Sequence, residues 1–369
     1  MLFQQIEKTL KSELKTFKTC LKKVVASSNG ISSLTEHFTD FQGKHLRPIL
    51  TMLAAKAVAP GKPLNAHHFN LAVVVELIHN AALVHDDVLD EAKLRRNVQT
   101  YNQRWGNEMA VIFGDYLFAR LFSHITTVQS TGLIKVISAT SNRVCLGELK
   151  HLMKRFNPHG LSEKEYLEII DSKTASLFTL ATYLGASVST KDTRIINALK
   201  SYGQNFGMAY QIMDDYKDIA ESDQTSGKST GNDLFKGKIT LPIIRTARNS
   251  PENISHRMKD ILSAVNPVRS ELRRDREHPL ERNEHNCGNS ILSGAKSSLL
   301  NASNGVNNNG RDLATKKNEL HKLLKQNGSL DYTYRQARHY TNSAIKNLKA
   351  LKNSTYKDIL IDLAESVIS

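Results

Sequence analysis

The chain has 369 residues, of which 40% are apolar and 23% are charged, and this composition excludes collagen-like, wholly disordered and disulfide-scaffold proteins. A total of 50 Lys and Arg residues against 36 Asp and Glu residues gives a net charge of +14. This excess favours an anionic partner such as nucleic acid, a lipid surface or a phosphorylated substrate.

Helical periodicity dominates the chain. In residues 2–25 the apolar side chains recur at spacings of three and four, which places them on one face of a helix. Residues 64–89 are apolar on nearly every side, as in a buried helix. Further helices are expected over residues 110–127, 133–155, 163–186, 192–220, 241–248 and from 319 to the end. Because no sustained alternation of period two and no Asn-Gly hairpin is present, the predicted fold class is all-α.

One segment, residues 266–317, lacks this periodicity. Within residues 283–310, 17 of 28 residues are Asn, Ser or Gly. Such a stretch cannot bury enough apolar surface to offset the chain entropy that folding would cost, so we expect a disordered insertion. The chain is therefore predicted to form a single helical domain over residues 1–369, interrupted late by this insertion.

The cysteines and the N-terminal segment predict a reducing compartment. Cys20, Cys145 and Cys287 are far apart in the sequence and form no CxxC pair, which argues against a zinc site and against disulfides. The N-terminal residues carry a charge every few positions, unlike a signal peptide, and no apolar run reaches the ~20 residues of a membrane span. We therefore expect a cytoplasmic protein.

Two aspartate clusters carry the strongest chemical signal, and each ends an apolar helical run. Their members are Asp86, Asp87 and Asp90 in the first cluster and Asp214, Asp215 and Asp218 in the second. In each cluster the first and last aspartates are four residues apart, so both carboxylates lie on one helical face and repel unless a cation lies between them. One such cluster is usually a solvated helix end, but two after strongly apolar helices favour Mg²⁺ and a diphosphate.

Basic residues accompany both clusters and suit phosphate oxygens. Lys44 and Arg47 lie one turn apart at a predicted helix start, where backbone N–H groups also favour anions. Arginine in particular matches phosphate geometry with its planar fork. The remaining basic candidates follow the clusters: Arg95 and Arg96 after the first, and Lys228 and Lys238 after the second. Together with the aspartates they predict a pocket for two anionic substrates.

These motifs resemble those of the trans-isoprenyl (polyprenyl) diphosphate synthases of the long-chain type. The matching stretches occur in the family's order and are GKHLRP, ELIHNAALVHDDVLDEAKLRRNVQT, WGNEMAVIFGDYLFAR, DSKTASLF, YQIMDDYKD and GKSTGNDLFKGKITLP. The resemblance covers roughly residues 1–265 and is weaker from 319 onward. It implies an isoprenoid-synthase-like helical bundle around a deep central cavity, with the two aspartate-rich helices facing each other at its mouth.

The resemblance also implies a role for each candidate residue. It assigns Asp86, Asp87, Asp90, Asp214, Asp215 and Asp218 to Mg²⁺, with three ions per active site when substrate is bound. It assigns the allylic diphosphate to Arg95, Lys173, Thr174, Gln211, Lys228 and Lys238, and isopentenyl diphosphate to Lys44, Arg47, His79 and Arg96. Among these, the expected catalytic residues are Asp86, Asp87 and Asp90 of the first DDxxD-like motif, Asp214 and Asp215 of the second, Lys173 and Lys228. A family glycine after the paired arginines is replaced here by Asn97.

The implied reaction is head-to-tail condensation of isopentenyl diphosphate onto an allylic diphosphate. In the family that this chain resembles, synthases of short products usually have a bulky aromatic residue just before the first aspartate cluster. This chain has Ala81 and Ala82 there. The two alanines leave the tunnel open and predict a product longer than about four isoprene units, unless they merely allow close helix packing. A homodimer and a peripheral membrane contact for product delivery are expected as well.

Several alternatives are weaker or stay open. A phosphate-loop match at Ser226–Ser229 fails because Ser222 stands where glycine is needed and no strand precedes it. Nucleic-acid binding is disfavoured because the basic residues are scattered and only 7% of residues are aromatic. A terpene cyclase would lack the second aspartate cluster. A short-chain synthase of the geranylgeranyl or farnesyl type and a silent subunit of a heteromeric synthase remain alternatives.

Overall fold

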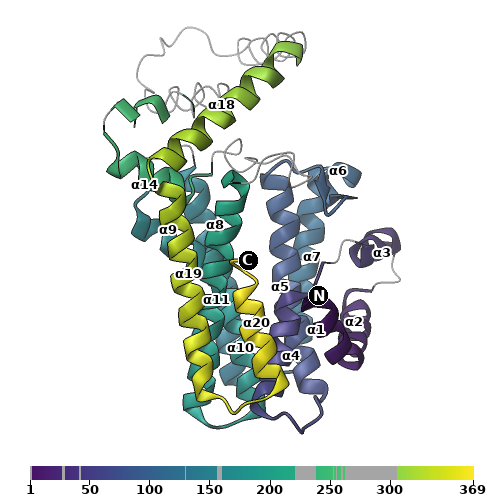
Figure 1. The fold of residues 1–369 in the computed structure, drawn as a ribbon. Helices are drawn as coiled ribbons and strands as arrows, with labels where there is room; N and C mark the ends of the chain where they lie inside the picture. Colours follow the sequence, from purple (N-terminus) through teal and green to yellow (C-terminus); the bar gives the residue numbers. More distant parts are fainter. Residues whose placement is uncertain are drawn as a thin grey trace. The chain divides into compact units, whose positions relative to one another are not determined.

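The longest apolar segment of the sequence forms the helix around which the others pack. Helix α5 (Ala66–Leu89) begins at Asn65, whose side chain accepts hydrogen bonds from the backbone N–H groups of His67 and His68. Its residues Leu71 to Ile78 are all buried, as expected for a helix that is apolar on every side. Figure 1 shows α5 beside α7 (Asn107–Ile125), with which it packs along its length.

The computed structural model describes residues 2–26, 30–40, 43–128, 130–155, 160–220, 238–251, 253–254, 256–258, 261 and 306–369. The chain divides into two compact units. Unit 1 comprises residues 1–152, 167–213 and 335–369, and unit 2 comprises residues 153–166 and 214–334.

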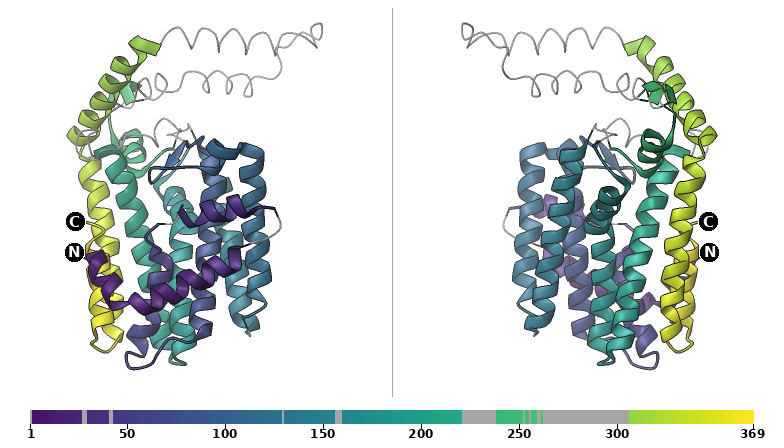
Figure 2. Two further views of the ribbon diagram at one scale, coloured as in Figure 1. Left: turned by 90° about the vertical axis from the view of Figure 1, so that its right-hand side faces the viewer. Right: turned by 90° about the vertical axis from the view of Figure 1, so that its left-hand side faces the viewer.

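Unit 1 is a helical bundle. Helix α5 packs against α4 (Leu46–Val58), α7 and α10 (Ser176–Ser189), and α4 also packs closely against α10. The N-terminal helix α2 (Lys11–Val25) crosses α5 and α7, as Figure 2 shows in purple. The other elements that lie wholly in this unit are α1 (Leu2–Thr9), α3 (Ser32–Asp40), α6 (Tyr101–Trp105), the π-helical turn η1 (Asp171–Ala175), the 3-10 turn η3 (Leu348–Ala350) and α20 (Thr355–Glu365).

Four helices pass from one unit into the other. They are α8 (Thr131–Lys154), α9 (Glu163–Ile170), α11 (Thr193–Ala220) and α19 (Ser329–Asn347). In unit 2, α14 (Leu241–Asn249) packs against α18 (Val306–Gln326). A buried hydrogen bond of 2.7 Å between Thr246 Oγ1 and Ser329 Oγ also joins α14 to the start of α19.

A short β-hairpin follows α5 and was not foreseen from the sequence. Strands β1 (Leu94–Arg95) and β2 (Val98–Gln99) pair antiparallel, with Arg95 opposite Val98. The two residues between the strands, Arg96 and Asn97, have φ values of 53° and 64°. A two-residue turn with positive φ at both positions matches the right-handed twist of a hairpin, and asparagine tolerates this backbone region better than most residues. Asn97 therefore stands at a position of positive φ, a backbone region that glycine also adopts readily.

The predicted all-α class is confirmed, with three differences in detail. The single helix expected over residues 2–25 is two helices, with a break at Leu10. The helix expected over residues 163–186 contains the π-helical turn η1. Within the expected disordered insertion, helix α18 already begins at Val306, while residues 262–305 lie outside the described residues. The single-domain assignment stays a prediction.

None of the helices in the described ranges combines the length and apolarity that a bilayer span requires.

Candidate active site

The first aspartate cluster occupies the last turn of α5, and its three carboxylates differ in environment. The side chain of Asp86 is 20% exposed, whereas that of Asp87 is 1% exposed. Arg95 donates to Asp87 from Nε and Nη2, with the Nη2–Oδ1 distance at 2.8 Å. A buried charge needs a partner, and Arg95 is the partner of Asp87. The more accessible aspartates of this cluster are Asp86 and Asp90.

Three of the residues predicted for the allylic diphosphate lie on or next to the turn η1, and one of them contacts Asp86. Lys173 lies on the π-helical turn η1, and its Nζ is 3.4 Å from Asp86 Oδ2. The next residue, Thr174, donates its hydroxyl to Gln211 Oε1 on α11 at 2.8 Å. π-helical turns occur frequently at functional sites, because the extra residue redirects side chains relative to a regular helix. The structure thus brings Lys173 to the first cluster and pairs Thr174 with Gln211.

Three of the four residues predicted for isopentenyl diphosphate also gather in unit 1. Arg47 Nη1 donates to His79 Nε2 at 3.0 Å, and the Arg47 guanidinium lies over the Phe178 ring at 4.3 Å. Arg96 lies directly against Gly43, where the Cβ of any other residue would collide with its guanidinium group. A side chain at position 43 would displace the end of the Arg96 side chain, which lies beside the segment that carries Lys44 and leads into α4 with Arg47.

Lys44 itself is exposed and extends toward the N-terminal helix. Its Nζ lies 4.2 Å from the centre of the Phe3 ring on α1, a cation–π distance. Lys44 immediately precedes His45, which has a left-handed backbone (φ 52°) and directs the chain into α4. The lysine therefore lies at the edge of the group formed by Arg47, His79 and Arg96.

A buried carboxylate supports this basic group. Glu76 on α5 is 3% exposed, and its Oε1 lies 3.0 Å from Nδ1 of the buried His45. Burial lowers the pKa of Arg47 to about 10, and the charge of Glu76 opposes that shift. Arg47 therefore stays charged at neutral pH, and Glu76 offsets part of the repulsion between Arg47 and Arg96.

His79 is neutral in this environment. Burial, followed by the charges of Arg47, Arg95 and Arg96, holds the pKa of His79 well below its usual value. Because Nε2 accepts the hydrogen bond from Arg47, the ring proton lies on Nδ1. The imidazole thus orients the Arg47 guanidinium without adding a further positive charge.

This shift makes stability depend on pH in a defined direction. The unfolded chain takes up a proton at His79 near pH 6.5, whereas the folded chain does not, so folding stability falls as the pH drops below about 6.5, by at most about 1.4 kcal/mol for each pH unit. A His79→Gln variant keeps a hydrogen-bond acceptor for Arg47 and loses this contribution. Urea unfolding at pH 7.5, 6.5 and 5.5 should show a smaller acid-side loss for the variant than for the wild-type protein.

His339, exposed on α19, provides the matched control for that measurement. A His339→Gln variant should reproduce the wild-type acid-side loss. Equal losses in wild-type and His79→Gln protein would show that His79 is not held neutral in the folded state.

The second aspartate cluster lies at the end of α11, in the part of that helix that belongs to unit 2. Asp214 is exposed, while Asp215 is 5% exposed and accepts a hydrogen bond of 2.6 Å from the Tyr166 hydroxyl. Asp218, one turn further on, is half-buried. Each cluster therefore has a more accessible first aspartate and a buried second aspartate that a neighbouring side chain holds.

The two basic candidates that follow the second aspartate cluster are Lys228 and Lys238. Lys238 is half-buried and precedes α14 in unit 2. Lys228 lies outside the described residues.

The two alanines predicted to line the tunnel are not equivalent. Ala81 is completely buried, whereas Ala82 is partly exposed. Ala82 lies one turn before Asp86 and on the same face of α5, together with the half-buried His79. Of the two, only Ala82 belongs to the accessible stripe of the helix that leads to the aspartates.

The aspartates of the first cluster fit a hard divalent cation by their chemistry. In the described ranges no group of three or more His, Cys, Asp or Glu side chains is arranged to hold a metal ion by itself. Mg²⁺ characteristically binds through one or two carboxylates, several waters and substrate phosphates, and does not need a complete protein cage. The accessible oxygens of Asp86 and Asp90 suit this mode of binding.

Sequence reasoning missed three residues that hold the candidate side chains in place: Glu76, Glu148 and Tyr166. Glu76 could have been found, because an acidic residue inside an otherwise apolar helix is seldom buried without a partner. Glu148 contacts Lys173, and Tyr166 binds Asp215, across separations in sequence that no local pattern reveals.

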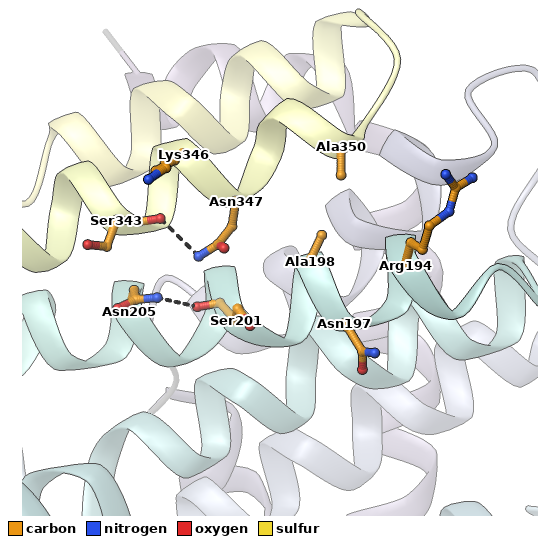
Figure 3. A pocket seen from close by; sticks show the side chains of 9 residues that line it. All are labelled: Arg194, Asn197, Ala198, Ser201, Asn205, Ser343, Lys346, Asn347 and Ala350. Atoms are coloured by element: carbon orange, nitrogen blue, oxygen red, sulfur yellow. Dashed lines mark hydrogen bonds between the residues drawn. The ribbon is translucent and has the colours of Figure 1, made fainter.

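A shallow polar pocket of about 610 Å³ lies elsewhere in unit 1, along α11 and α19 (Figure 3). Its lining includes Ser201 and Asn205 on α11 and Ser343 and Asn347 on α19. The side-chain amides of Asn205 and Asn347 donate to backbone carbonyls within their own helices. None of the predicted site residues lines this pocket.

A helical bundle in which an aspartate-rich helix end lies beside a lysine and a group of arginines suits the binding of diphosphates. A family model described as polyprenyl synthetase matches residues 28–275. The chain belongs to the polyprenyl synthetase family and is a prenyltransferase.

Individual relatives extend this finding. The all-trans-nonaprenyl-diphosphate synthase (geranyl-diphosphate specific) of Rhodobacter capsulatus is 32% identical over 90% of this chain and 87% of the relative. A polyprenyl synthase structure from Caulobacter crescentus CB15, complexed with calcium and isoprenyl diphosphate, has a TM-score of 0.75 and 27% identity over 100% of this chain and 97% of that chain. The geranylgeranyl pyrophosphate synthetase of Pyrococcus horikoshii Ot3 has a TM-score of 0.78 and 26% identity over 100% and 98%. Since these enzymes carry names of different product classes, the fold alone does not define product length.

Proposed function

We propose that this protein condenses isopentenyl diphosphate head-to-tail onto an allylic diphosphate and produces a long-chain all-trans polyprenyl diphosphate. The observation that carries the proposal is the arrangement in unit 1. The accessible Asp86 contacts Lys173 at the end of α5, and the same helix carries His79 next to Arg47. Helix α5 thus carries parts of two groups of side chains. The first group contains Asp86 and Lys173 and suits a metal ion with one diphosphate, and the second contains His79 and Arg47 and suits another diphosphate.

The residues of the first group suit the departure of diphosphate. Lys173 supplies a positive charge, and Thr174, by donating its hydroxyl to Gln211 Oε1, orients the Gln211 side-chain amide, whose NH₂ group is a hydrogen-bond donor. Fixed charges and dipoles of this kind stabilise negative charge as it develops on the leaving group, without reorganisation during the reaction. Arg95 neutralises Asp87 through Nε and Nη2, and the donors of its Nη1 group suit a phosphate oxygen.

The residues of the second group suit the binding of isopentenyl diphosphate. Arg47, Arg96 and Lys44 provide the positive charge, and neutral His79 orients Arg47. Apolar helix faces around the reacting carbons would exclude water from the allylic carbocation. The released diphosphate is a suitable acceptor for the proton that is lost, so no side-chain base is assigned.

Asp86 and Asp90 would hold Mg²⁺, with Asp214 and Asp218 as the corresponding residues of the second cluster. Bound Mg²⁺ supplies neutralisation of the negative charge on the leaving diphosphate. Asp87 and Asp215 would support these ligands through their bonds to Arg95 and Tyr166. Three ions per active site, and contacts of Lys228 and Lys238 with the allylic diphosphate, rest on the family resemblance.

The long-chain product is supported by the small side chain at Ala82 and by the name of the Rhodobacter capsulatus relative. A short-chain product of the geranylgeranyl or farnesyl type is the alternative. Product length is therefore a separate outcome of the functional test.

The assembly is proposed to be a homodimer, in line with the family resemblance. Helix α7 supports this by exposing Met109, Val111, Ile112 and Phe122, the last two by more than 60%. Apolar side chains gathered on one helix are typical of a protein interface. A cytoplasmic location and a peripheral membrane contact for product delivery remain predictions from the sequence.

The direct test incubates the purified protein with labelled isopentenyl diphosphate, an allylic primer and Mg²⁺. We expect EDTA-sensitive incorporation of label into products longer than about four isoprene units. Chromatography of the dephosphorylated products gives their length. Products of four units or fewer would establish the short-chain alternative. No elongation, under conditions where a known synthase is active, would instead identify a silent subunit.

A further inference from the structure

Lys173 is held by a second carboxylate that belongs to neither aspartate cluster. Glu148 lies on α8, and its Oε2 is in direct contact with Lys173 Nζ. The same Nζ lies 3.4 Å from Asp86 Oδ2. The side chains of Glu148, Lys173 and Asp86 are only 15%, 24% and 20% exposed, so the three groups form a largely buried chain of charges.

The backbone keeps Glu148 close to Lys173. Gly147, the residue before Glu148, approaches the turn η1 so closely that a Cβ there would be 2.7 Å from the Lys173 backbone nitrogen. A side chain at position 147 would have to push η1 away from α8. The backbone of α8 just before Glu148 is therefore anchored next to the backbone of the turn that carries Lys173.

The charge of Glu148 persists at neutral pH. Although burial alone would raise its pKa, His151 and Lys173 together hold the pKa of Glu148 well below its usual range. His151 lies one turn further along α8, with Nδ1 3.7 Å from Glu148 Oε1. The groups that face the Glu148 carboxylate are thus Lys173 from η1 and His151 from its own helix.

The contact with Glu148 restricts where the Lys173 ammonium group can lie. A lysine carries its compact charge on a flexible four-carbon stem, so a single ion-pair partner leaves the ammonium group much freedom to move. A cation or substrate that occupies Asp86 would weaken the contact between Lys173 and Asp86. Glu148, which lies outside the aspartate clusters, would still restrain the ammonium group.

We propose that Glu148 is a positioning residue that holds Lys173 toward the allylic diphosphate. The proposal rests on the proposed function, because it assigns Lys173 to that substrate. It explains why α8 contributes an acidic residue beside a lysine that must attract an anion: the carboxylate orients the ammonium group, and the phosphate then competes for its outer N–H donors.

The test compares Glu148→Gln, Glu148→Asp and Lys173→Met with the double variant Glu148→Gln/Lys173→Met. Loss of a residue that orients an active-site group typically costs about 10- to 100-fold in activity or affinity. We expect Glu148→Gln to lower kcat with the allylic substrate by that factor and to leave the KM for isopentenyl diphosphate nearly unchanged. Glu148→Asp, which keeps the charge, should recover most of the rate.

The double variant separates positioning from folding. If Glu148 acts through Lys173, Glu148→Gln should have little further effect once Lys173 is methionine. Glu168→Gln on α9, which removes an exposed carboxylate, is the matched control and should behave as wild type. Additive losses in the double variant, or a wild-type rate in Glu148→Gln, would overturn the proposal.

A second readout does not depend on turnover. Titration calorimetry with inorganic diphosphate and Mg²⁺ should show weaker binding to Glu148→Gln than to wild type, and the same binding for both variants in the Lys173→Met background. If wild-type protein binds diphosphate with this coupling but forms no product, the proposed function fails and the role of Glu148 stands. If it forms product without the coupling, only the role of Glu148 fails.

Discussion

Replacement of Asp86 by asparagine is expected to reduce the rate of chain elongation by at least about 100-fold. Asp86 is the accessible aspartate at the end of α5 and faces Lys173. Asparagine keeps the shape of the side chain but removes the charge that would attract Mg²⁺ and the diphosphate bound to it. Incorporation of labelled isopentenyl diphosphate, measured over a range of Mg²⁺ concentrations, gives the rate and the metal requirement.

The Asp86 experiment has two internal comparisons. Asp358→Asn on α20 removes an exposed carboxylate in the same bundle and should retain the wild-type rate. Asp87→Asn should in addition lower stability in the absence of metal, because it leaves Arg95 without its buried partner. An Asp86→Asn enzyme that keeps more than a tenth of the wild-type rate at saturating Mg²⁺ would show that this carboxylate is not a metal ligand.

The second large effect is expected on product length, from phenylalanine at position 82. Ala82 is the partly exposed alanine on the face of α5 that carries His79 and Asp86. A ring in place of its methyl group would obstruct the path of the growing chain one turn from the diphosphate. We expect Ala82→Phe to shorten the product to about four isoprene units or fewer, as measured by mass spectrometry of the dephosphorylated lipids.

Ala81 provides the contrast. It is completely buried, so a phenylalanine there must displace packed neighbours, which typically costs about 1–3 kcal/mol of stability. Ala81→Phe should therefore lower the melting temperature more than Ala82→Phe does, and Ala82→Ser should keep the wild-type product. If Ala82→Phe left product length unchanged, the accessible face of α5 would not be the wall of the tunnel.

Much of the fold and of the candidate site could be predicted from the sequence. The all-α class followed from apolar spacings of three and four, because the periodicity of a helix is written directly into the order of its residues. The aspartate clusters were equally visible, since a spacing of four places two carboxylates on one helical face whatever the rest of the fold does. Together with the ordered basic motifs they were sufficient to predict the family.

Local irregularities of the backbone could not be predicted. The turn at Arg96 and Asn97 and the π-helical turn η1 each reverse or shift the direction of side chains that the site uses. Neither feature has a strong signal in the local sequence. Whether arginine adopts a positive φ in such a turn, and whether a helix takes in an extra residue, both depend on how the neighbouring elements pack. They determine where Arg95, Arg96 and Lys173 point.

By itself, therefore, the sequence determined which residues are candidates for the chemistry and on which elements they lie. Only the tertiary structure decided their partners: Asp87 with Arg95 across the hairpin, His45 with Glu76, and Lys173 with Glu148. The physical reason is that burial of a charge depends on what a second element places beside it. Helical periodicity describes a single element, and the pairing of charges between elements is decided when those elements pack.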